Sequence, residues 1–353
     1  MSHDQPLTPL MATADVLVPS AVSVVVPALD AEPSLALCLQ AITRSAGGTA
    51  EVIVVDDGSR DRTGAIARQH GATVIRHDRP RGPAAARNAG AARARGDVIL
   101  FLDADVVLAE DGVARVLGVL GGDPGLAAVF GSYDDAPAAR TLVSEYRNLL
   151  HHFVHQTSRE DSESFWAGCG AIRRQVFLAV GGFDERYRRP SIEDIELGGR
   201  LARRGYRVAL DRRLRATHLK RWTVGRVLLA DVRDRAYPWA RLILDRGRMP
   251  ADLNLRYEHR ASAALVWLGI ALALGLPLAR ATATRTVLVL VLLLAAGGLL
   301  ALNRRFYRFL VDRRGVLFAA RAVPLHLLYY ASASATFAWC WIAHRWTGRP
   351  ATS

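Results

Sequence analysis

The sequence predicts an α/β domain with a mostly parallel sheet, followed by helices that cross a membrane. Short apolar runs alternate with helix-like segments in the first half, and long apolar stretches fill the C-terminal third. Residues 1–230 hold 29 basic and 27 acidic side chains, whereas residues 231–353 hold 17 and 6. Because the excess positive charge lies beside the apolar stretches, it indicates a membrane surface and excludes a nucleic-acid partner.

The elements of the first half follow in order. The valine run from Val22 to Val26 ends at Pro27 and is typical of a buried parallel strand. We expect further strands at 52–55, 73–75 and 98–102, with helices at 35–41, 63–70 and 84–95. Strands that alternate with helices predict a parallel sheet, which binds ligands at the carboxyl ends of its strands. The domain continues with strands near 127–133, 165–172 and 206–210 and a helix at 195–204.

The C-terminal part is organised by its apolar stretches. Residues 226–260 are amphipathic, arginine-rich and interleaved with aromatic residues, which predicts helices at a membrane surface; a helix packed on the α/β domain is the alternative. Three apolar stretches follow, each close to the roughly 20 residues that span a bilayer. They lie at 261–279, 283–302 and 322–343, and residues 344–353 form a tail.

Charge in the connecting loops predicts the orientation. The loop 303–321 carries six arginines against Asp312, whereas Arg280 and Arg285 are the charges around the preceding turn. Because arginine excess marks the cytosolic side, we expect a multi-pass protein of the inner membrane with a cytosolic N-terminal domain. Residues 1–20 are an irregular lead-in without the pattern of a signal peptide. The three scattered cysteines exclude a zinc site or disulfide framework and fit a reducing compartment.

Acidic residues follow two of the expected strands. Asp103 and Asp105 stand one residue apart, and such a pair can share Mg²⁺ or Mn²⁺, which would bridge the phosphates of a nucleotide. A solvated turn is the alternative. Asp57, in an Asp-Asp-Gly-Ser run, can accept hydrogen bonds from a base or ribose. Arg87 and Asn88 lie near a helix start, where they meet a diphosphate or hold the fold together.

These motifs, in this order and at this spacing, resemble the family 2 glycosyltransferases, which have the GT-A fold. The valine strand, the Asp-Asp-Gly-Ser run, the GxxxARNxG stretch at 82–90 and the Asp103–Asp105 pair carry the first half of the resemblance. In the second half, Gly168-Cys169-Gly170 resembles an acceptor-side segment, and Ile192-Glu193-Asp194 resembles the family's "ED" segment. The resemblance covers about residues 20–225 and implies a GT-A domain over 21–225.

The resemblance implies transfer of a sugar from a nucleotide-sugar donor with inversion, with Asp194 as the catalytic base. It places the donor nucleotide against Pro27, Ala28, Asp30, Asp57, Arg87 and Asp103. It places a divalent metal at Asp105 and Asp103, with His218 nearby, and the acceptor or diphosphate at Gly168, Gly170 and Glu193. An N-terminal cap of the following helix is the alternative role for Asp194.

The run His218-Leu219-Lys220-Arg221-Trp222 resembles the QxxRW motif of processive family members, with histidine in place of glutamine. In this setting Lys220 or Arg221 pairs with a diphosphate and Trp222 stacks on a sugar. An interfacial anchor just before the membrane is the equal alternative for Trp222.

The presence of a base favours one class of acceptor. A polyprenyl phosphate is already ionised near neutral pH, whereas a hydroxyl must lose a proton. Asp194 therefore favours a hydroxyl on a lipid or lipid-linked glycan, with a polyprenyl-phosphate glycosyltransferase as the alternative. A nucleotidyltransferase, which would release pyrophosphate, and an inactive membrane scaffold are the more distant alternatives.

Overall fold

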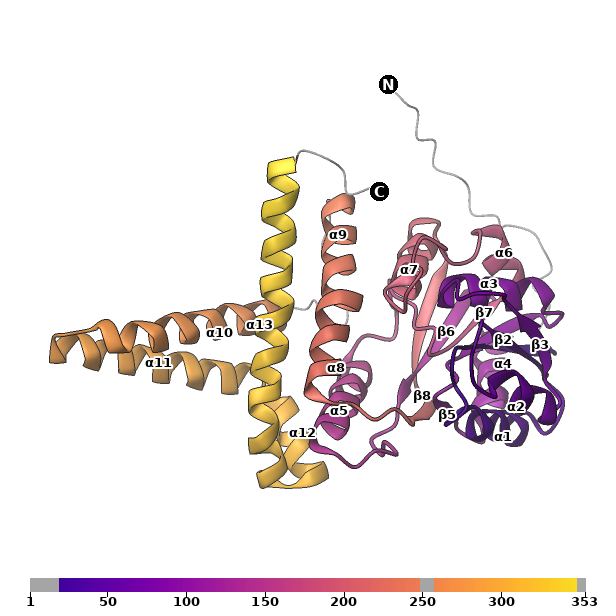
Figure 1. Cartoon of the computed structure of the whole chain (residues 1–353), viewed down its shortest axis with the longest axis horizontal. Helices are drawn as coiled ribbons and strands as arrows, with labels where there is room; N and C mark the ends of the chain where they lie inside the picture. The colour runs from indigo at the N-terminus through magenta and orange to yellow at the C-terminus, as the bar shows by residue number, and fades with distance from the viewer. Residues whose placement is uncertain (1–18, 248–256, 348–353) are drawn as a thin grey trace. The chain divides into compact units, whose positions relative to one another are not determined.

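The computed structural model describes residues 19–247 and 257–347 and divides the chain into two units (Figure 1). The first unit comprises Met1–Ala138 with His155–Lys220, and the second comprises Ala139–Val154 with Arg221–Ser353. The chain therefore leaves the first unit, contributes one segment to the second, and returns. The expected lead-in, the 248–256 part of the expected interfacial segment and most of the tail lie outside the described residues.

The first unit contains a mixed eight-stranded sheet flanked by helices. Its elements are β1 (Val22–Ala28), α1 (Leu35–Ala46), β2 (Glu51–Asp56), α2 (Thr63–Gln69), β3 (Thr73–Arg76), α3 (Pro83–Arg93), β4 (Val98–Leu102), β5 (Val106–Leu108), α4 (Gly112–Gly122), β6 (Leu126–Tyr133), β7 (Cys169–Arg173), α6 (Arg174–Ala179), α7 (Glu193–Arg203) and β8 (Arg207–His218). Helix α5 (Leu142–Thr157) joins the two units along the chain.

The strand order in the sheet is β3-β2-β1-β4-β7-β6-β8-β5. Strands β3, β2, β1 and β4 run parallel, and β7 enters antiparallel to both β4 and β6. Apolar side chains alternate between the two faces of the sheet, as the period of a strand requires. Val24 and Val26 pack with residues of α1 and α4 on one face, whereas Val25 packs with residues of α3 and α7 on the other.

The predicted α/β class with a mostly parallel sheet is confirmed, and the first four strands and three helices lie where the sequence placed them. The second half differs in its bounds. The strand expected at 165–172 begins at Cys169, because Phe165 and Ala167 belong to the irregular segment before β7. The strand expected at 206–210 extends to His218 and pairs with both β6 and β5. The expected elements did not include β5, α4, α5 or α6.

The second unit is helical within its described residues. Its elements after α5 are α8 (Val224–Leu229), the π-helix η1 (Ala230–Ala236), α9 (Tyr237–Arg246), α10 (Tyr257–Gly275), the 3₁₀ turn η3 (Leu276–Leu278), α11 (Thr282–Leu302), α12 (Arg304–Arg314) and α13 (Val316–Thr347). The basic loop expected at 303–321 is thus mostly helix α12 and the first turns of α13.

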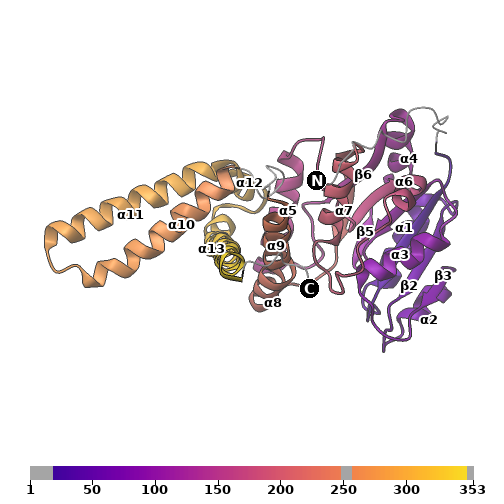
Figure 2. The ribbon, with the colours of Figure 1, turned by 90° about the horizontal axis from the view of Figure 1, so that it is seen from above.

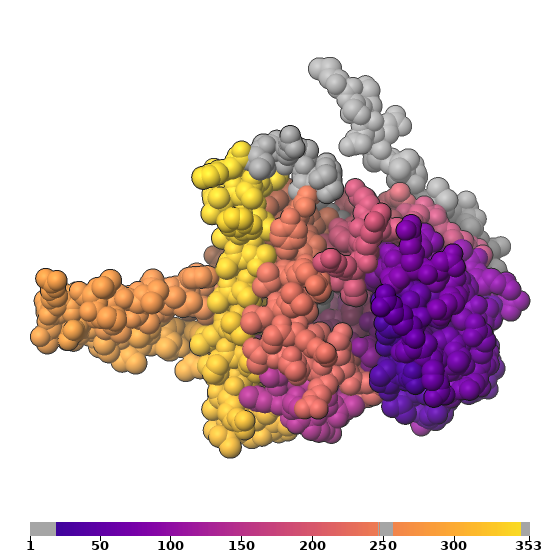
Figure 3. All heavy atoms as spheres, viewed as in Figure 1, coloured from indigo at the N-terminus to yellow at the C-terminus, as the bar shows by residue number. Residues whose placement is uncertain are grey.

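Three helical segments among the described residues are long and apolar enough to cross a membrane, as the sequence predicted. They are Tyr257–Leu278, Thr282–Leu302 and Val316–Trp346. Helices α10 and α11 lie side by side in both ribbon views (Figures 1 and 2). The hairpin that α10 and α11 form is largely exposed (Figure 3). Only 11% of the most apolar stretch of each of these two segments is buried. Such exposed apolar surface is what lipid would cover.

The N-terminal segment of α5 packs in the core of the second unit. Tyr146, Leu149 and Leu150 are buried with Phe306 and Leu310 of α12. The sequence did not predict this division, because 139–154 lies inside the stretch over which the family resemblance runs.

Candidate active site

Neighbouring strands of the first unit end at one edge of the sheet. Ala28 pairs with Asp56 in register, and the backbone N–H of Asp57 donates to the carbonyl of Ala28 at 2.8 Å. Strand β4 runs parallel to β1 and ends at Leu102, so Asp103 follows at the same edge. Because the carboxyl ends of parallel strands carry the ligand sites of such sheets, Ala28, Asp57 and Asp103 come together where a ligand is expected.

Asp57 holds the loop that follows β3. Its side chain is buried, and Oδ1 accepts hydrogen bonds from His77 Nδ1 at 2.6 Å and from the amide of Arg81 at 2.9 Å. Its Oδ2 accepts from the amide of Gly82 at 2.8 Å. Gly82 has a φ of +100°, and a Cβ there would lie 2.4 Å from the carbonyl oxygen of Arg188, so this position requires glycine. Asp57 thus shapes the loop, and its contact with a nucleotide stays a prediction.

Asp30 plays a comparable part in the loop after β1, a strand that ends with Pro27 and Ala28. Its backbone has a φ of 48°, a left-handed conformation that aspartate tolerates better than most residues. The Oδ1 of Asp30 accepts from the amide of Arg60 at 2.8 Å, and its own amide donates to Ser59 Oγ at 3.0 Å. These bonds tie the loops after β1 and β2 to one another.

Arg87 of α3 is a buried link between two carboxylates. Its Nη2 donates to Asp103 Oδ1 at 2.7 Å, and its Nη1 donates to Glu193 Oε1 at 2.7 Å. Arg87 and Glu193 are 5% and 4% exposed, and Glu193 Oε2 also accepts from the amide of Ser191. The Asp103–Asp105 motif and the Glu193–Asp194 segment are therefore joined through α3. Of the two roles predicted for Arg87, these contacts support holding the fold together.

Asp194 lies in the first turn of α7, where Oδ2 accepts from the amide of Ala167 at 3.1 Å. The N-cap position belongs to Ile192, but Asp194 Oδ1 accepts from the amide of Ile195 at 2.8 Å, so the side chain also binds one of the amides at the start of α7. Burial, reinforced by the neighbouring charge of Glu193, raises the pKa of Asp194 to about 7, although Arg87 opposes the shift. A carboxylate with a pKa near neutrality is a better proton acceptor than an ordinary aspartate.

Asp105 faces the end of β8. Its Oδ2 lies 3.7 Å from Nε2 of His218, which is 7% exposed. Burial opposes ionisation of Asp105, but His218 and then Lys220 outweigh it and hold the pKa of this carboxyl below its ordinary value. At Asp103 burial is the larger effect and raises the pKa despite Arg87.

An aromatic stack that the sequence did not single out supports His218. Its ring stacks on Tyr133 at 4.5 Å between centroids, and Tyr133 in turn meets the edge of Trp166 at 4.8 Å. A Cβ at Gly168 would lie 2.6 Å from the Trp166 ring, and one at Gly170 would lie 2.3 Å from the Trp166 carbonyl. The two glycines thus make room for Trp166, and the Gly168 carbonyl accepts from the amide of Asp103. Their predicted contact with an acceptor stays a prediction.

Arg221 and Trp222 belong to the second unit. The amide of Trp222 donates to Ser144 Oγ at 2.8 Å, and the guanidinium of Arg147 lies 5.7 Å from the Trp222 ring centroid. Arg147 also pairs with the buried Asp231 at 2.6 Å. Trp222 is therefore fixed by α5, whichever of its two predicted roles it serves.

Within residues 19–247 and 257–347, no group of three or more histidine, cysteine, aspartate or glutamate side chains is arranged to hold a metal ion. Asp105 and His218 nevertheless fit as two ligands. Adjacent ligands at about 2.1 Å from an octahedral ion stand roughly 3 Å apart, so a small shift of the two side chains from their 3.7 Å separation would let them share one ion. Magnesium is commonly held by one or two carboxylates together with substrate phosphates.

Comparison with known proteins shows which families the N-terminal part of the chain resembles. The family model described as Glycosyl transferase family 2 matches residues 23–181. An uncharacterised glycosyltransferase of Haemophilus influenzae is 27% identical over 182 residues, which cover 49% of this chain and 59% of that protein. An undecaprenyl-phosphate 4-deoxy-4-formamido-L-arabinose transferase of Pseudomonas paraeruginosa is 38% identical over 105 residues, covering 27% of this chain and 31% of that protein. The chain thus spans only part of the length of these relatives.

A solved structure shares the fold over most of the chain. The mannosyltransferase PcManGT from Pyrobaculum calidifontis, solved in complex with GDP-Man and Mn²⁺, superposes with a TM-score of 0.60 and 23% identity. The match covers 90% of each chain. Together with the motifs at the sheet edge, these comparisons show that residues 23–181 match the family 2 glycosyltransferase model and that this part of the chain has the GT-A fold.

Proposed function

We propose that this glycosyltransferase moves a sugar, with inversion, from a nucleotide-sugar donor to a hydroxyl of a lipid or lipid-linked glycan at the cytosolic face of the inner membrane. The observation that carries the proposal is the carboxylate of Asp194. This residue is half-buried, and the loss of contact with water raises its pKa to about 7. Only an acceptor that must lose a proton needs such a base. The family match favours sugar transfer over nucleotidyl transfer.

The chemical step follows from the charges. The ionised Asp194 takes the proton from the acceptor hydroxyl, and the freed oxygen electron pair attacks the anomeric carbon of the donor. The bond from that carbon to the diphosphate breaks on the opposite face, so one displacement inverts the configuration. Lys220, which already lowers the pKa of Asp105, adds positive charge near the place where the diphosphate departs.

A divalent ion, Mg²⁺ or Mn²⁺, would be held by Asp105, with His218 and the donor phosphates, and with Asp103 close by. When bound it supplies Lewis-acid stabilisation of the departing diphosphate. The bond between Arg87 and Asp103 leaves Asp105 as the carboxylate better placed to serve as a ligand. The Mn²⁺ in the complex of the mannosyltransferase from Pyrobaculum calidifontis supports a metal requirement for the shared fold.

Transfer to a polyprenyl phosphate is the second candidate. The observation that favours it is the similarity to the undecaprenyl-phosphate transferase of Pseudomonas paraeruginosa, at 38% identity over 105 residues. In that reaction the acceptor phosphate is already ionised, so Asp194 would not remove a proton. The two candidates therefore differ in how much they depend on this carboxylate.

The test compares Asp194→Asn with the unchanged protein on both acceptor classes. Detergent-purified protein is given a panel of nucleotide sugars, and release of UDP, GDP or dTDP is measured with a hydroxyl acceptor and with undecaprenyl phosphate. Loss of transfer to the hydroxyl acceptor in the variant supports the proposal. Unimpaired turnover with that acceptor contradicts it, and transfer to undecaprenyl phosphate alone, by both the unchanged protein and the variant, selects the second candidate. Glu110→Gln, at an exposed carboxylate, controls for the change in charge.

The same proposal places three spans in the membrane. The arginines of α12 mark the cytosolic side, so α11 ends and α13 begins there, and the turn between α10 and α11 lies on the other side. A reporter fused after the last residue of the chain should then be active outside the cytosol. A reporter active in the cytosol would contradict three spans.

A further inference from the structure

Helix α12 occupies a defined place between two candidate spans. It begins at Arg304, directly after α11 ends at Leu302, and it ends at Arg314, directly before α13 begins at Val316. Both neighbouring helices are long and apolar enough to cross a membrane. A short helix that joins the ends of two adjacent spans lies at the membrane boundary, because the single residues that link it to each span are too short to let it move away from the membrane.

One side of α12 is fixed in the second unit. Phe306 and Leu310 are 3% and 0% exposed and pack with Tyr146 and Leu149 of α5. At the C-terminal end, Arg314 Nε donates to Glu145 Oε1 at 2.7 Å. These contacts set the rotation of α12 about its axis and so decide which of its side chains face outward.

The outward side carries positive charge that the protein does not neutralise. Arg304, Arg305 and Arg308 are exposed, and in the parts of the chain that the structure describes none of them forms an ion pair. Arg305 and Arg308 stand three residues apart, so their charges are neighbours on the helix surface and repel one another. Such an arrangement is stabilised when an anion lies against it.

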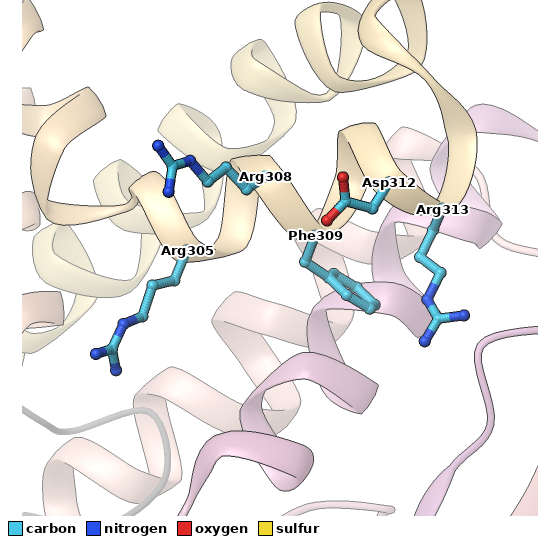
Figure 4. Close-up of a pocket in the computed structure, with 5 residues that line it drawn as sticks. All are labelled: Arg305, Arg308, Phe309, Asp312 and Arg313. Carbon is cyan, nitrogen blue, oxygen red and sulfur yellow. The ribbon is translucent and has the colours of Figure 1, made fainter.

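Two of these arginines, Arg305 and Arg308, line an open cavity of about 380 Å³ (Figure 4). In Figure 4 the side chains of Arg305 and Arg308 extend from α12 in different directions, and Phe309, Asp312 and Arg313 complete the lining. The guanidinium of Arg313 lies 5.7 Å from the centroid of the Phe309 ring. The lining thus combines three guanidinium groups, one carboxylate and an aromatic ring, a combination suited to the boundary between lipid headgroups and acyl chains.

We propose that the outward side of α12 is a binding site for the phosphate groups of anionic membrane lipids, with Arg305 and Arg308 as its main ligands. A guanidinium matches a phosphate with two parallel hydrogen bonds, and arginine is weakly hydrated compared with lysine. The position between two span ends selects a lipid headgroup over a free phosphate ion. The inference rests on the membrane placement proposed above and is independent of the acceptor.

The test uses the full-length protein in nanodiscs of phosphatidylcholine mixed with phosphatidylglycerol. The protein is extracted in mild detergent, and the lipids that remain bound are identified by mass spectrometry. We expect the unchanged protein to retain phosphatidylglycerol in excess of its share in the nanodisc. The double variant Arg305→Gln/Arg308→Gln should lose that excess, and Arg305→Lys/Arg308→Lys should keep part of it.

The matched control is Arg280→Gln/Arg285→Gln, which removes the same charge from two exposed positions, one just before α11 and one in its first turn. This control should retain the lipid excess. Equal retention by the α12 double variant overturns the proposal, and so does an equal loss in the control, because net charge alone would then account for binding. Displacement of the lipid by inorganic phosphate would indicate a free-anion site instead. Circular dichroism confirms that each variant is folded, and transferase activity in detergent tests the proposed function separately.

Discussion

Replacement of Arg87 by methionine distinguishes a structural link from a diphosphate ligand. In the structure both terminal nitrogens of Arg87 are used, by Asp103 and Glu193, each at 2.7 Å. Methionine has similar length and no charge, so it fills the space and leaves two carboxylates without their cation. If Arg87 is the link that these contacts indicate, the change destabilises the folded protein.

The size of the effect follows from burial. Arg87 is 5% exposed and Glu193 is 4% exposed, so the carboxylate left behind has little access to water. Removal of one partner of a buried ion pair costs about 3–5 kcal/mol. For a unit of this size, each kcal/mol lowers the melting temperature by roughly 2–4 °C, so we expect a fall of about 6–20 °C.

The assay is thermal unfolding of the detergent-purified protein, followed by circular dichroism, together with the KM for the nucleotide sugar. Arg81→Met is the matched control, because Arg81 pairs with Glu185 at 3.0 Å but is 52% exposed. An exposed pair contributes about 0–1 kcal/mol, so this control should unfold near the temperature of the unchanged protein. Arg87→Lys, which keeps the charge but loses the planar fork, should fall between the two.

One result would refute this reasoning. If Arg87→Met unfolds at the same temperature as Arg81→Met while the donor KM rises steeply, Arg87 binds the diphosphate, and its contacts with Asp103 and Glu193 contribute little to stability.

Three further predictions concern the base, the metal and the packing of the sheet. Because Asp194 accepts a proton only when ionised and its pKa is about 7, kcat/KM with a hydroxyl acceptor should rise as pH increases through about 7, and a flat profile would contradict a base at this position. Asp194→Asn should lower kcat by about 10²–10⁴-fold with nucleotide affinity unchanged in calorimetry. Asp105→Ala should weaken the binding of a nucleoside diphosphate in the presence of Mn²⁺, as measured by calorimetry. In chelator, the variant and the unchanged protein should bind it equally. An unaltered affinity with Mn²⁺ argues against Asp105 as a metal ligand. Gly90→Ala should lower the free energy of unfolding by about 1–3 kcal/mol, because the added Cβ would lie 2.4 Å from Val25 Cγ1. Gly118→Ala is the control: its Cβ would have no neighbour within 4 Å, so thermal unfolding should show a gain of about 0.5–1 kcal/mol.

The parts of the fold that the sequence predicted are those with strong local signals. Val22–Val26, apart from Ser23, and 98–102 are apolar because β1 and β4 are buried on both faces, and Asp103 directly follows β4. The second half was harder because its pairing is not local. Strand β8 is polar at alternate positions through Arg213 and Arg215, and it is held by β6 and β5 rather than by an apolar run of its own.

The candidate site shows the same limit. Sequence motifs located Asp103, Asp105 and Asp194, but they did not predict that Arg87 would join two of these motifs. The sequence did not single out Tyr133 and Trp166, because an aromatic residue in or next to a predicted strand is usually part of the hydrophobic core. Their stack with His218 forms only when β6 and β8 pair. The one signal available was Trp166, two residues before the first glycine of the Gly168-Cys169-Gly170 segment.

The placement of 139–154 in the second unit bears on how the protein is made and handled. During synthesis Leu149 and Leu150 emerge long before their partners Phe306 and Leu310. At roughly 5–20 residues per second, this face stays uncovered for about 8–30 s, while the spans are being inserted. A truncation after residue 225 would leave the same apolar face bare permanently. Isolated preparations of the transferase domain should therefore require either detergent or polar substitutions on this face of α5 to stay dispersed.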